Sequence, residues 1–134
     1  MTIQKQITVK KNLVYPELSY KIIGILYGVY NEVGGGFREK YYQKAISEAL
    51  RLAKVSYAEQ IYVPLLFKAK KIGFYYLDFL IENKIILEIK AGELFNRRNI
   101  KQVISYLKGA KLKLGILANF TKSGVCYKRI LNLY

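Results

Sequence analysis

Three strand-like runs follow one another in the middle of the chain with very short connections. Rich in apolar, β-branched and aromatic residues, they cover 60–67, 72–81 and 85–91. Their connections of four and three residues are too short for a crossover, so each run must pair antiparallel with the next. The chain is therefore restricted to folds that contain an antiparallel meander.

Helical periodicity flanks the meander on both sides. Before it, Ser19 is expected to cap a first helix that ends at Gly34, and a second helix is expected from about 38 to 54. After it, helical spacing returns over 96–108, and a further strand follows over 112–120. A helix placed between two strands in this way predicts that those strands pair in parallel.

The order of these segments predicts the fold class. Two helices, three strands, a helix and a strand indicate an α/β fold, with one mixed central sheet flanked by helices. Residues 125–130 fit either a last strand or a short helix. The length of 134 residues, without a repeat or a linker, predicts a single domain over 1–134, in which 1–16 form a basic N-terminal extension.

The charge of the chain indicates its class of partner. With 23 Lys and Arg against 9 Asp and Glu, the formal net charge is +14, which attracts polyanions such as nucleic acid. An anionic membrane surface is the weaker alternative, because no helix is basic on one face and apolar on the other. No apolar stretch reaches the ~20 residues of a spanning helix, and the first residues lack the apolar core of a secretory signal. We therefore expect a cytoplasmic protein without a membrane partner.

Cysteine and histidine usage excludes several kinds of active site. Cys126 is the only cysteine, and there is no histidine. These counts exclude a disulfide framework within the chain, cysteine-cluster zinc sites, and nucleophiles activated by histidine. The few acidic residues are the remaining candidates for chemistry.

Two carboxylates interrupt the second and third strand-like runs. Asp78 stands in an otherwise apolar run, where an ionised carboxylate is costly unless a cation or several hydrogen bonds compensate it. Glu88 and Lys90 are two residues apart and share one face of the next run. If 82–84 form a three-residue loop, Asp78 lies opposite Glu88 with Cβ atoms about 5 Å apart. A divalent cation that binds oxygen ligands would stabilise this pair, although an ion pair with Lys90 would satisfy the same pattern.

A third carboxylate begins the second helix. Glu39 precedes Tyr42 and Ile46 by three and seven residues, which places it at the head of the apolar stripe and not on the wet face. From Gly36 to Tyr42 the chain also resembles a known family, because it matches the Gly-x-x-Glu-x-x-Tyr motif of the GxxExxY proteins.

Two further motifs extend this resemblance to a superfamily. Asp78 with Glu88-Ile89-Lys90 looks like the PD-(D/E)XK nuclease motif. Gln102 and Tyr106 look like the Gln-x-x-x-Tyr element of several of its branches. The resemblance covers about 17–132 and implies the restriction-endonuclease-like αβββαβ core, which agrees with the element order expected from periodicity.

The resemblance also implies an activity and a set of site residues. The activity is Mg²⁺-assisted hydrolysis of phosphodiester bonds in nucleic acid, with DNA as the expected substrate and Mn²⁺ as a substitute metal. The implied metal ligands are the carboxylates of Glu39, Asp78 and Glu88 and the main-chain carbonyl of Ile89. Lys90 would orient the attacking water or offset charge that develops on the phosphate. The other implied residues share the following helix: Gln102 and Tyr106 as positioning groups, and Arg97, Arg98 and Lys101 as contacts to the nucleic-acid backbone.

Simpler explanations of the same residues stay open. Helix packing would account for Gln102 and Tyr106, and a solvated pair would account for Arg97 and Arg98. The alternative functions are a non-catalytic nucleic-acid-binding module that keeps the nuclease fold, and a structural protein whose acids form ion pairs. The sequence leaves the oligomeric state open, although a homodimer would suit action on duplex DNA.

Overall fold

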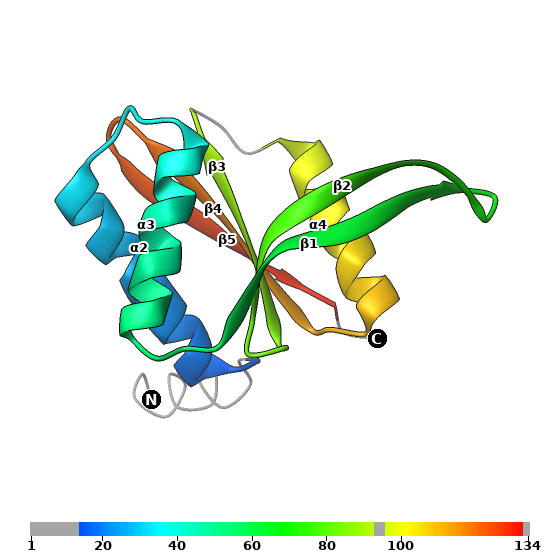
Figure 1. The fold of residues 1–134 in the computed structure, drawn as a ribbon, viewed down its shortest axis with the longest axis horizontal. Helices are drawn as coiled ribbons and strands as arrows, with labels where there is room; N and C mark the ends of the chain where they lie inside the picture. Colours follow the sequence, from blue (N-terminus) through cyan, green and yellow to red (C-terminus); the bar gives the residue numbers. More distant parts are fainter. Residues whose placement is uncertain (1–13, 93–95, 133–134) are drawn as a thin grey trace, which may run out of the picture.

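The fold is built on one mixed sheet of five strands (Figure 1). The computed structural model describes residues 14–92 and 96–132. The strands lie side by side in sequence order: β1 (Tyr57–Phe67), β2 (Lys70–Ile81), β3 (Ile85–Ala91), β4 (Leu114–Thr121) and β5 (Gly124–Leu131). β3 and β4 are parallel, because α4 (Arg97–Ala110) carries the chain from one to the other. The other neighbouring pairs are antiparallel.

Helices cover both faces of this sheet. α2 (Pro16–Val33) and α3 (Glu39–Leu52) lie on one face, and α4 lies on the other (Figure 1). β3 and β4 are buried on both faces, which explains why their sequences are almost continuously apolar. The core on the α2–α3 side includes Ile22, Leu26, Tyr42, Ile46, Phe79, Leu87 and Ile116. The core on the α4 side includes Leu77, Ile86, Val103, Leu107, Leu117 and Ile130.

β2 leaves β3 part-way along its length. Its pairing with β3 ends at Phe79↔Leu87, whereas its pairing with β1 continues to the tip of the hairpin at Phe67↔Lys70. The hairpin therefore projects past α4 (Figure 1). We call residues 60–77 of this hairpin the arm.

The structure confirms the expected mixed sheet with flanking helices, and the order of its elements. The short loop after β2 brings Ile81 opposite Ile85, as a three-residue connection requires. Residues 125–130, for which the sequence allows a strand or a helix, belong to β5 and pair antiparallel with β4.

The predicted helix start at Ser19 is wrong. α2 begins at Pro16, and Ser19 is buried within it, with its N–H bonded to the carbonyl of Tyr15 at 2.9 Å. Proline suits this position because its φ is already helical and an N–H there would have no partner within the helix. The sequence predicts a basic N-terminal extension over 1–16. Residues 1–13 lie outside the described part of the chain, and Pro16 already belongs to α2. Among the described helices, none combines the length and the apolarity needed to cross a membrane.

Candidate active site

Two buried carboxylates meet where β2 separates from β3. Glu88 Oε1 accepts a hydrogen bond from the main-chain N–H of Asp78 at 3.0 Å, and Asp78 Oδ2 accepts one from the main-chain N–H of Ile89 at 2.7 Å. Both bonds lie just beyond Phe79↔Leu87, the last pair of the ladder between β2 and β3. The structure brings together the two acids that the sequence expectation places opposite each other.

The electrostatics of this pair are unfavourable in the absence of a cation. Removal from water raises the pKa of Glu88 to about 8, and the negative charge of Asp78 contributes in the same direction. Burial also raises the pKa of Asp78, and Glu59 on β1 adds to that rise. Lys90 acts in the opposite sense on both groups, but one ammonium does not compensate two buried carboxylates. The donor set therefore fits a divalent cation, which binds carboxylate oxygens and would offset their charge.

Lys90 lies between this pair and Glu39. Its Nζ is 3.6 Å from Glu88 Oε2 and 3.9 Å from Glu39 Oε1. Glu39 is the first residue of α3 and is partly exposed. Within 14–92 and 96–132, no group of three Asp, Glu, Cys or His side chains is arranged to hold a metal ion. The structure thus brings Asp78 and Glu88 together, and Lys90 contacts both Glu88 and Glu39.

Gln43 is a site residue that the sequence analysis missed. Its Nε2 donates a hydrogen bond to Asp78 Oδ1 at 2.7 Å. Gln43 follows Glu39 by four residues, so the two share one face of α3. That spacing is the signal that could have identified Gln43, once Glu39 was expected to face the sheet.

Tyr42 connects the glycine-rich turn before α3 to the sheet. Its hydroxyl donates to the carbonyl of Gly34 at 2.8 Å and accepts from the N–H of Phe37 at 3.2 Å. Its ring stacks on Phe120 of β4, with centroids 4.2 Å apart. Tyr42 therefore fixes the glycine-rich turn onto the sheet and sets the position from which Glu39 extends.

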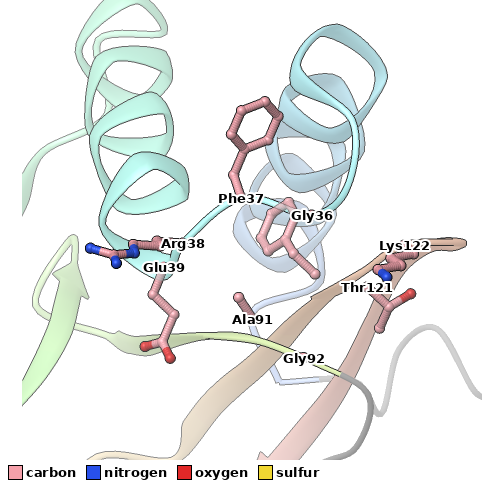
Figure 2. Close-up of a pocket in the computed structure, with 9 residues that line it drawn as sticks. Gly36, Phe37, Arg38, Glu39, Ala91, Gly92, Thr121 and Lys122 are labelled. Carbon is pink, nitrogen blue, oxygen red and sulfur yellow. The ribbon is translucent and has the colours of Figure 1, made fainter.

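A cavity of about 440 Å³ opens beside Glu39. It lies between the start of α3 and the carboxyl ends of the parallel strands β3 and β4 (Figure 2). In Figure 2 the Glu39 side chain extends from α3 toward β3. The lining residues are Gly36, Phe37, Arg38, Glu39, Ala91, Gly92, Phe120, Thr121 and Lys122.

The residues of α4 that the sequence predicts for the site are exposed or interact with other parts of the molecule than the carboxylate pair. Arg97, Arg98 and Lys101 are exposed near the start of the helix. The Tyr106 side chain packs against the core on the α4 side, and the main-chain carbonyl of Gln102 accepts a hydrogen bond from the Tyr75 hydroxyl at 3.1 Å. In the part of the chain that the structure describes, no hydrogen bond joins the Gln102 or Tyr106 side chain to Asp78 or Glu88.

Comparison with known proteins identifies the family. The family model that matches residues 16–130 describes the PD-(D/E)XK nuclease superfamily. The chain belongs to this superfamily. Among solved structures, the crystal structure of SSO0001 is similar, with a TM-score of 0.54 and 18% sequence identity. The match covers 69% of this chain and 50% of SSO0001, so the chain corresponds to half the length of that protein. At this identity the likeness shows a similar fold alone. No curated protein matches the chain.

Proposed function

We propose that this chain is a metal-dependent nuclease that hydrolyses phosphodiester bonds of nucleic acid, with DNA as the favoured substrate. The observation that carries the proposal is the buried pair of Asp78 and Glu88, whose pKa values are raised by removal from water and, at Glu88, by the negative charge of Asp78. A divalent cation would supply that charge. Membership of the PD-(D/E)XK nuclease superfamily supports the same chemistry.

The proposed metal ligands surround the point where β2 and β3 separate. Asp78 and Glu88 would hold Mg²⁺, or Mn²⁺ in its place, together with the main-chain carbonyl of Ile89. Glu39 would contribute directly or through a water molecule. When bound, the ion supplies a Lewis acid that polarises the phosphate and lowers the pKa of a water molecule.

Lys90 and Gln43 have distinct proposed roles beside these ligands. The Lys90 ammonium, 3.6 Å from Glu88 Oε2, is suited to orient the attacking water or to offset negative charge that grows on the phosphate. Gln43 holds one oxygen of Asp78 by a 2.7 Å hydrogen bond. It therefore orients the Asp78 carboxylate beside the proposed metal and acts as a positioning residue.

Basic side chains would bring the substrate to this site. The net charge of +14 favours encounter with a polyanion, and Arg97, Arg98 and Lys101 are exposed for contacts to the backbone. Gln102 and Tyr106 would position the phosphate or the helix that carries these cations. We also infer membership of the GxxExxY proteins, which the fixing of the glycine turn by Tyr42 supports.

One observation favours a second candidate function, a nucleic-acid-binding module without catalysis. Lys90 lies near both Glu88 and Glu39, and no three-carboxylate group forms among the described residues. Such a module would shift nucleic acid in a gel without cutting it, and its affinity would fall with rising salt.

The test is cleavage of supercoiled, linear and single-stranded DNA, and of RNA, with Mg²⁺, with Mn²⁺ or with EDTA. Asp78→Asn and Glu88→Gln should each lower the cleavage rate by at least about 100-fold, since the metal ligands act as a unit. Glu48→Gln is the matched control, because Glu48 is an exposed carboxylate paired with Arg51 on α3, and it should cleave at the wild-type rate.

Three outcomes would contradict the nuclease proposal. Cleavage that persists in EDTA would exclude a divalent metal, and cleavage by Asp78→Asn at the wild-type rate would exclude the proposed site. Binding by the wild type without cleavage of any substrate would favour the binding module.

A further inference from the structure

The arm presents a row of aromatic side chains to solvent. Tyr62, Phe74 and Tyr76 are 46%, 55% and 50% exposed. Tyr62 pairs directly with Tyr76 across the hairpin, and the three ring centroids lie 5.5 to 5.9 Å apart. We call these three residues the aromatic row.

The opposite side of the arm is already occupied. Val63 and Leu77 are buried in the core on the α4 side, with Tyr75 packed against it. Because successive strand residues point to opposite faces, the aromatic row faces away from this core, and its three rings are about half exposed. The Tyr75 hydroxyl also bonds to the carbonyl of Gln102 on α4, which holds the arm in place while the rings of the aromatic row stay exposed.

All charges on the arm are positive. Residues 60–77 contain Lys68, Lys70 and Lys71 and no acidic residue. Lys71 Nζ lies 5.2 Å and 5.3 Å from the ring centroids of Tyr62 and Phe74. A polyanion complements this surface, whereas a second copy of the arm would bring like charges together in a chain of net charge +14.

The aromatic row leads toward the carboxylate pair. Phe74, Tyr76 and Asp78 are alternate residues of the one strand β2. At about 3.4 Å per residue, Tyr76 lies ~7 Å and Phe74 ~14 Å along the strand from Asp78. The rings are therefore within reach of a nucleic-acid strand bound at the carboxylate pair.

We propose that the arm binds unpaired bases of a single-stranded segment of nucleic acid. The bases stack on Tyr62, Phe74 and Tyr76, and the lysines at the tip contact phosphates. In a duplex the base faces are covered by neighbouring base pairs, so exposed rings find this partner only on unpaired bases. Only the position of the bound segment, next to the cleaved bond, rests on the proposed nuclease function.

The test is binding of fluorescent oligonucleotides to the whole chain in EDTA, which separates binding from cleavage. Three probes of equal length are compared: a single strand, a duplex, and a strand of abasic sites that keeps the phosphates and lacks the bases. Phe74→Ala and Tyr76→Ala should each weaken binding of the single strand about tenfold, because stacking on an aromatic side chain carries an effect of this order. Binding of the duplex and of the abasic strand should change less than twofold.

Matched variants separate stacking from charge and from folding. Phe74→Tyr and Tyr76→Phe keep a ring and should bind the single strand like the wild type. Tyr20→Ala removes an exposed tyrosine on α2, away from the arm, and should have no effect. Lys71→Gln should weaken binding of the normal and the abasic strand alike, and should reduce the slope of log affinity against log salt by about 0.7.

Several results would overturn the inference. Unchanged single-strand binding in Phe74→Ala and Tyr76→Ala would exclude stacking on these rings, and equal losses for all three probes would indicate phosphate contacts alone. A wild-type dimer that these variants convert to monomers would assign the arm to a second copy. Since the assay contains no divalent metal, a failed cleavage test leaves its result intact, and a negative binding result leaves the nuclease proposal intact.

Discussion

Replacing Glu88 with glutamine should remove most of the pH dependence of stability that the carboxylate pair creates. Burial and Asp78 raise the pKa of Glu88 to about 8 in the folded protein, against an ordinary value of 4.5. Below pH 4.5 the carboxyl is protonated in both folded and unfolded states, so it adds no pH-dependent term. Between pH 4.5 and about 8 the unfolded chain loses this proton while the folded protein keeps it, so the metal-free protein loses stability as the pH rises.

The size of this loss follows from the same values. At about 1.4 kcal/mol per pH unit, the difference between 4.5 and about 8 sets an upper bound of about 5 kcal/mol. Urea unfolding in EDTA at pH 5 and pH 8 measures the loss. Between pH 5 and pH 8, we expect the unfolding free energy of the wild type to fall by at least about 2 kcal/mol more than that of Glu88→Gln. The reason is that the amide keeps an oxygen for the main-chain N–H of Asp78 and carries no charge.

Two controls make this experiment decisive. Glu48→Gln removes an exposed carboxylate from α3 and should retain the wild-type pH dependence. Addition of Mg²⁺ at pH 8 should raise the unfolding midpoint of the wild type and not that of Glu88→Gln, since binding to the folded state alone stabilises it. Equal pH dependence in the wild type and Glu88→Gln would refute the assignment of the buried charge to this residue.

Three further substitutions test residues that hold the site and the adjacent glycine-rich turn in position. Gln43→Ala removes the hydrogen bond to Asp78 and should lower metal affinity about tenfold, measured as the Mg²⁺ concentration for half-maximal cleavage. Gly35→Ala would place a Cβ 2.5 Å from the carbonyl oxygen of Thr121, and should lower the unfolding free energy by about 2 kcal/mol or more in urea, because the close atoms are backbone. Tyr42→Phe loses two hydrogen bonds and should lower the unfolding free energy in urea by about 1 to 2 kcal/mol. It should also reduce cleavage if the turn that carries Glu39 loosens.

Much of the fold and the meeting of the two acids were predictable from the sequence. Short connections force antiparallel pairing, and a three-residue loop brings Ile81 opposite Ile85. Because side chains alternate along strands, this register also decides that Asp78 and Glu88 approach each other. A local constraint of a few residues thus determined a contact between two strands.

The separation of β2 from β3 was not predictable in the same way. Apart from Asp78, β2 is apolar or aromatic from Phe74 to Ile81, yet Leu77 packs on the α4 side and Phe79 on the α2–α3 side. Which side receives a side chain depends on how the strand twists between helices that are distant in the sequence. For the same reason the aromatic residues of the arm could be expected in a strand but not on a solvent-exposed face.

Gln43 and Ser19 show the limits of reasoning about polar residues. The spacing of four residues from Glu39 indicates that Gln43 shares its face of α3, but only the partner on β2 reveals the role of Gln43. A serine near an apolar run is a common helix cap, but Pro16 lies earlier in the chain and begins the helix. For Gln43 the deciding interaction lay outside the local pattern, whereas for Ser19 it was a local signal three residues earlier.

The reciprocal bonds between the carboxylates and the backbone affect the choice of inactive variants. An alanine at Glu88 would leave the buried amide of Asp78 without an acceptor, and an alanine at Asp78 would do the same to the amide of Ile89. Each unpaired amide would lower the unfolding free energy by about 1 to 3 kcal/mol. Alternatively, β2 and β3 would approach each other and pair where they now separate. An alanine variant that fails to cut would then report a changed sheet as much as a missing ligand, whereas asparagine and glutamine keep the strands apart.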